Sequence, residues 1–102
     1  MEEGYYQALL TCGERYVSML NKFIVDNEYW GWNKSPATAE KATDLWMFIG
    51  EFIQGCNNKL PLMKLNRWLG YIQGCLIQWE ITTVQDERDW TRPLFRPLDF
   101  KE

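Results

Sequence analysis

Proton-transfer chemistry has few candidate residues in this sequence, because none of its 102 residues is histidine. Histidine is the side chain best suited to proton transfer near neutral pH and the commonest metal ligand, so its absence excludes catalytic triads, dyads and most zinc sites. A cysteine nucleophile would still need a base. Cys12, Cys56 and Cys75 lie in apolar stretches without close paired spacing, which predicts buried thiols rather than a disulfide framework or a zinc site.

Carboxylates are the remaining groups that could perform acid–base work or bind magnesium. Glu40 with Asp44, and Asp86 with Asp89, have spacings that place each pair on one helical face, and Glu51 is a further acid that a magnesium enzyme could use. Both pairs fall in the first turns of expected helices, where the helix dipole favours acids without any function. We therefore weigh capping above metal binding and predict no catalytic residue, no metal and no cofactor.

Two glycines, Gly70 and Gly74, interrupt the most regular helical pattern of the chain, next to Asn66 and Arg67. A glycine inside a helix costs about 1 kcal/mol relative to alanine, so something should compensate. One interpretation is close approach by the backbone of another helix of the same chain. The other is a groove in which Arg67 presents its planar guanidinium to a carboxylate or phosphate.

Three large aromatic residues surround a glycine in the segment Tyr29-Trp30-Gly31-Trp32. Such rings are difficult to bury completely within a short connection. They are either exposed, as in the hot spots of protein interfaces, or cover the end of a small helical bundle. The sequence leaves both interpretations open.

Apolar residues recur at alternating steps of three and four along most of the chain, which indicates amphipathic helices. Ser35 and Pro36 provide the expected start of the second helix. We predict helices over residues 3–26, 36–56, 62–79 and 83–91. The expected buried face of the second helix is Ala39, Ala42, Trp46, Ile49, Ile53 and Cys56; that of the third is Leu62, Leu65, Leu69, Ile72, Leu76 and Trp79.

The C-terminal tail contains Pro93 and Pro97, each of which lacks a backbone donor and biases the preceding residue toward extended backbone. These prolines predict that the tail is not helical. Its apolar residues suggest that it lies along the helices as an extended strap, with four anchors: Leu94, Phe95, Leu98 and Phe100.

The composition is that of a globular protein, with 46% hydrophobic and 25% charged residues and a net charge of −3. We expect a single helical domain over residues 1–102. The mixed charges disfavour nucleic-acid binding. The acidic N-terminus does not resemble a signal peptide, and no apolar run approaches the roughly 20 residues that span a bilayer, so we expect a cytoplasmic protein without a membrane partner.

Residues 66–74 (NRWLGYIQG) and residues 87–95 (ERDWTRPLF) resemble a pattern in small uncharacterised bacteriophage and prophage proteins. The resemblance covers about the C-terminal third of the chain. Such proteins often act in host takeover or in blocking host defences. The resemblance therefore implies an accessory role in the cytosol of an infected host cell, without naming the target.

The sequence as a whole predicts an all-α protein: a compact bundle of three longer helices, a short fourth helix and an extended C-terminal strap. The favoured hypothesis is a non-enzymatic phage-type accessory protein that binds and modulates or inhibits a host protein, such as one of a defence system. The alternatives are an oligomeric sponge for a small anionic nucleotide-type signal and, less favoured, a magnesium-dependent enzyme. A homo-oligomer is compatible with each. The predicted interaction residues are Tyr29, Trp30, Trp32, Asn66, Arg67, Gly70 and Gly74.

Overall fold

Four helices follow one another in the computed structural model, which describes residues 2–99. They are α1 (Glu2–Trp30), α2 (Ala39–Asn57), α3 (Leu62–Gln78) and α4 (Val84–Asp99). No strand occurs in the described residues. The prediction of an all-α bundle is confirmed, and its individual elements differ from the prediction at several points.

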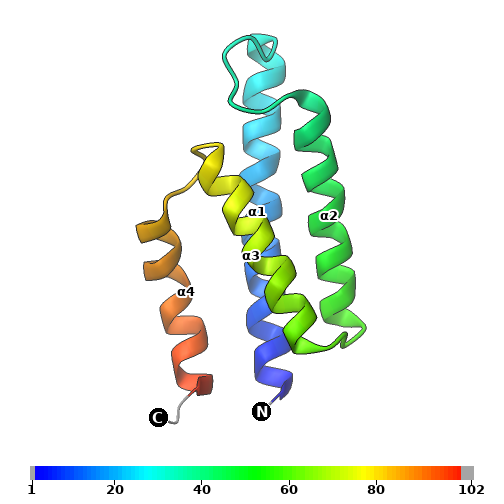
Figure 1. The fold of residues 1–102 in the computed structure, drawn as a ribbon, viewed down its shortest axis with the longest axis vertical. Coiled ribbons are helices and arrows are strands. Elements are labelled where there is room, and N and C mark those ends of the chain that lie inside the picture. The colour runs from blue at the N-terminus through cyan, green and yellow to red at the C-terminus, as the bar shows by residue number, and fades with distance from the viewer. Residues whose placement is uncertain (1, 100–102) are drawn as a thin grey trace.

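Helix α1 is the central helix of the bundle. Its 29 residues, at a rise of about 1.5 Å each, span about 44 Å, close to the longest dimension of the molecule, 47 Å. α1 packs against each of the other three helices. Figure 1 shows α2 and α4 on opposite sides of α1, with α3 crossing it obliquely.

The core lies where α1, α2 and α3 meet. Apolar residues that repeat with the helical period face it from each of the three helices, as expected for amphipathic helices. Leu69 and Ile72 are buried as the sequence predicts. In α2 the predicted buried face is partly wrong, since Ala39 and Trp46 are exposed while Leu45 and Phe52 are buried. The buried residues of the core are Tyr6, Leu9, Cys12, Tyr16, Leu20, Ala42, Leu45, Ile49, Phe52, Cys56, Leu65, Leu69, Ile72 and Leu76.

Close helix approach occurs at Gly13 and not at Gly70 or Gly74. A Cβ atom on Gly13 of α1 would lie 2.7 Å from Cγ1 of Ile53 on α2. At Gly70 and Gly74 an added Cβ would meet nothing within 4 Å. The interpretation of close internal approach at these two glycines is therefore wrong, because their helix face is open.

Helix α1 is longer than predicted and includes Tyr29 and Trp30. Asn27 lies inside the helix, and its side chain donates to the carbonyl of Phe23 one turn earlier, at 2.9 Å. The helix ends at Gly31, whose φ of 77° is readily adopted by glycine. The amide of Trp32 then donates to the carbonyl of Asn27 at 2.9 Å and closes the end.

Helix α2 starts three residues later than predicted. Ser35 is not the N-cap, because its hydroxyl accepts from the amide of Ala37 in the preceding turn. The N-cap is Thr38, whose hydroxyl accepts from the amide of Lys41 at 3.1 Å. Pro36 therefore lies in the connection and not at the first helical position.

Helix α4 corrects the prediction of a short fourth helix followed by an extended strap. Instead of ending near residue 91, the helix continues to Asp99 and contains Pro93 and Pro97. Both prolines are exposed, so water can solvate the carbonyls that lose their amide donors. Leu94 and Phe95 pack against the core, and the fourth predicted anchor, Phe100, lies outside the described residues.

None of the helices within residues 2–99 combines the length and the apolar character needed to cross a membrane.

Candidate functional site

The most polar cluster of the interior surrounds Glu87, near the start of α4. Glu87 is buried, with its side chain 5% exposed. It accepts hydrogen bonds from Arg15 at 3.0 Å, from the hydroxyl of Thr82 at 2.6 Å, and from the hydroxyl of Tyr16. Gln73 of α3 donates to the Tyr16 hydroxyl at 2.9 Å. The cluster thus connects α1, α3 and α4.

Electrostatics keeps Glu87 ionised. Burial alone would raise its pKa, but the hydrogen bonds from Arg15, Thr82 and Tyr16, together with the charge of Arg15, place the pKa below its ordinary value. Burial and the bond to Glu87 raise the pKa of Tyr16. Because the carboxylate has three donors within the protein and Tyr16 is fully buried, we interpret this cluster as a structural clasp between helices.

No pattern in the sequence predicted this clasp. Glu87 lies beside Asp86 in the first turns of the expected helix, where the helix dipole alone explains an acid. In the structure Arg67 is exposed and Arg15 is the partner. Arg15 also lies over the Trp90 ring, 4.4 Å from its centroid. The three-residue spacing of Glu87 and Trp90 places both on one helical face, and this spacing was the sequence signal for a buried face of the fourth helix.

The thiols are poorly suited to nucleophilic chemistry. Cys12 and Cys56 are buried, and burial raises the pKa of Cys12 to about 12 and that of Cys56 to about 11. Cys75 is only partly buried. The prediction of buried thiols is therefore confirmed for Cys12 and Cys56.

The carboxylates considered for magnesium are exposed: Glu40, Asp44, Glu51, Asp86 and Asp89. Thr83 caps α4, with its hydroxyl accepting from the amide of Asp86 at 3.0 Å. Within residues 2–99 no three side chains of the types His, Cys, Asp and Glu come together in a group that could hold a metal ion.

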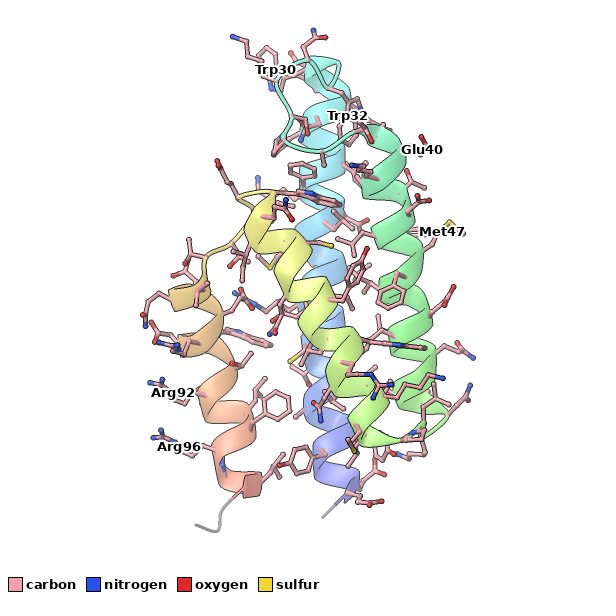
Figure 2. The ribbon with its side chains drawn as sticks, viewed as in Figure 1. Trp30, Trp32, Glu40, Met47, Arg92 and Arg96 are labelled. Carbon is pink, nitrogen blue, oxygen red and sulfur yellow. The ribbon has the colours of Figure 1, made fainter. Side chains whose placement is uncertain are left out.

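The predicted interaction residues divide between two regions. One is the apex, which we define as Tyr29 and Trp30 at the end of α1. Their side chains are 80% and 73% exposed, and their rings pack edge to face with centroids 5.0 Å apart. Trp30 lies at the protruding end of the molecule (Figure 2).

Trp32, the third aromatic residue of the predicted loop, has a different role. It is partly buried, and its ring packs edge to face on Phe23 of α1, 5.9 Å between centroids. Phe23 in turn stacks on Trp79 at 6.3 Å. Trp32 therefore fixes the connection after α1, whereas Tyr29 and Trp30 point outward, so the two interpretations of the aromatic segment each hold for part of it.

The second region is the glycine face, which we define as Asn66, Arg67, Gly70 and Gly74 on α3. All four residues are exposed. Because the space above both glycines is open, no other described element covers this face. Met63, one turn before Arg67, is also largely exposed.

Comparison with protein-family models, curated proteins and solved structures gives no match for this chain. The functional argument therefore rests on these surfaces. The apex combines two large aromatic rings with a cavity of about 450 Å³ lined by Asn27, Trp30, Asn33 and Lys34. A concave surface with an aromatic wall and a polar rim is suited to receiving a side chain of another protein.

Proposed function

We propose that this chain is a non-enzymatic accessory protein of the bacteriophage type that binds a host protein and modulates or inhibits it. Proteins of host defence systems are the target class that we favour. Binding is stoichiometric, and the complex forms in the host cytosol. The apex is the primary contact surface.

The exposure of Tyr29 and Trp30 is the observation that carries this proposal. Trp and Tyr are the residue types most enriched in interface hot spots, where they are buried by the partner. At the apex their backbone is fixed by the hydrogen bond from Trp32 to Asn27 and by the packing of Trp32 on Phe23. A rigid aromatic pair loses little conformational entropy when a partner covers it.

The glycine face supports a second contact. Gly70 and Gly74 lower helix stability, although no other part of the described chain lies within 4 Å of the place where a Cβ would stand. A surface without Cβ atoms lets the backbone of a partner helix approach closely, and Arg67 beside it can pair with an acidic side chain of that helix. The same face could also serve self-association, which light scattering of the purified protein would detect.

The experiment is affinity capture from bacterial lysate with three proteins: the wild type, the double variant Tyr29→Ala/Trp30→Ala, and Trp46→Ala as an exposed tryptophan on another face. We expect the wild type and Trp46→Ala to retain the same protein in a fixed ratio, and the double variant to lose it. Failure to retain a stable partner at several salt concentrations would contradict the proposal, as would equal capture by the double variant.

A further inference from the structure

A cleft opens between α2 and α3, on a part of the molecule separate from the apex and the glycine face. Figure 1 shows α3 diverging from α2 toward its C-terminal end. Two adjoining cavities occupy this region, of about 490 Å³ and 330 Å³, and both are lined by Lys41, Gln78 and Trp79. The larger is within the range of small-molecule sites, about 300 to 1,000 Å³.

Aromatic side chains that pack against other rings line the cleft. Trp79 is held by its stack on Phe23, with an angle of 17° between the ring planes. Phe48 and Tyr71, which also line the larger cavity, pack edge to face with 5.2 Å between ring centroids. Aromatic rings of this kind act as sequence-tolerant stacking platforms for nucleobases.

Three polar side chains line the cleft. Lys41 and Gln78 border both cavities, while Asp44 borders only the larger one. Among residues 2–99 none of these three side chains takes part in a hydrogen bond or an ion pair. The cleft therefore offers a cation near its middle, an amide that both donates and accepts, and a carboxylate toward one end.

We propose that this cleft binds a mononucleotide whose base carries an exocyclic amino group. The base stacks against the wall formed by Trp79, and the amide of Gln78 bonds to the edge of the base. Asp44 accepts from the exocyclic amino group, and Lys41 pairs with the phosphate. This binding site is independent of the proposed protein contact at the apex.

The probes are AMP, IMP, adenosine and inorganic phosphate, each titrated into the full chain at up to millimolar concentration and followed by amide NMR shifts. AMP should shift amides within residues 38–48 and 71–79. IMP keeps the phosphate but replaces the amino group by a carbonyl, so it should bind more weakly, as should adenosine and phosphate alone. No shift in these two segments with either nucleotide would overturn the proposal.

Three variants test the individual roles. Lys41→Ala should weaken AMP binding about tenfold, the lower end for a charge-assisted hydrogen bond, and leave adenosine binding unchanged. Asp44→Asn should reduce the preference for AMP over IMP. Lys64→Ala is the matched control, because Lys64 is exposed on α3 and lies over the Trp68 ring outside the cleft. Equal AMP affinity in Lys41→Ala and the wild type would contradict this site.

Discussion

Glu87 of α4 bonds to two residues of α1 through one carboxylate, and α3 joins the cluster through the bond from Gln73 to Tyr16. Its donors Arg15 and Tyr16 are 72 and 71 residues away in the sequence, so no local pattern could reveal the contact. In the sequence, the position of Glu87 is explained by the helix dipole alone, because acids are common in the first turn of a helix. Individual partners of this kind depend on tertiary packing, which is why the clasp could not be predicted.

Replacing Glu87 with alanine should lower the free energy of unfolding by about 2–4 kcal/mol. The change leaves Arg15, Tyr16 and Thr82 without their acceptor, and partial exposure of Arg15 keeps the loss below that of a fully buried pair. Urea unfolding measures this value. Glu51→Ala on the exposed face of α2 is the control and should change stability by less than about 0.5 kcal/mol; similar losses in both variants would contradict the clasp.

Acid should weaken the same clasp. The folded-state pKa of Glu87 lies below its ordinary value of 4.5, so its ionised form stabilises the fold above that pH, and the contribution is lost as the pH falls through the folded pKa. We expect the stability difference between the wild type and Glu87→Gln to be largest near neutral pH and to shrink below about pH 4.5. A difference that grows on acidification would refute this assignment of charge.

At the scale of the helices, substitutions of Gly70 and Gly74 test whether this face of α3 is uncovered. Because nothing lies within 4 Å of an added Cβ, Gly70→Ala and Gly74→Ala should each raise stability by up to about 1 kcal/mol. Thermal unfolding measures the change. Gly13→Ala is the control with the opposite expected sign, since its Cβ would lie 2.7 Å from Ile53. Destabilisation by alanine at position 70 or 74 would show that this face is covered.

Helix α4 should depend on its contact with α1. Phe95 is partly buried, and its ring centroid lies 6.1 Å from that of Tyr5. Phe95→Ala should therefore destabilise the protein by about 1–2 kcal/mol, less than a fully buried phenylalanine. Arg96→Ala on the exposed face is the comparison and should have little effect. Equal stability of the two variants would mean that the second half of α4 does not pack on α1.

The sequence predicted α1, α2 and α3 well because their apolar residues repeat with the helical period, and errors were confined to their ends and to the phase of α2. For α4 two signals conflicted. Pro93 and Pro97 argued against a helix, while Trp90, Leu94 and Leu98 are spaced four apart as on one helical face. In the structure α4 packs on α1, and this contact outweighs the hydrogen bonds that the prolines remove. The sequence of the tail alone does not reveal this contact.

At the scale of the whole molecule, the length of α1 determines what is exposed. The helix reaches the protruding end of the bundle, where Figure 2 shows Trp30. Tyr29 precedes it in the helix and is also largely exposed to solvent. The sequence identified these rings as candidates, but only the arrangement of the helices separates them from Trp32. The cleft between α2 and α3 was not predicted, because it results from the divergence of two helices and not from a motif.

The most direct test of the central claim is the dissociation constant of the complex with the captured partner, measured for the wild type and for Tyr29→Ala/Trp30→Ala. Because both side chains are largely exposed, the melting temperature of the variant should be nearly unchanged. Its binding free energy should fall by at least about 2 kcal/mol, a factor of about 30 in Kd. An unchanged Kd at equal melting temperature would contradict the apex as the contact surface.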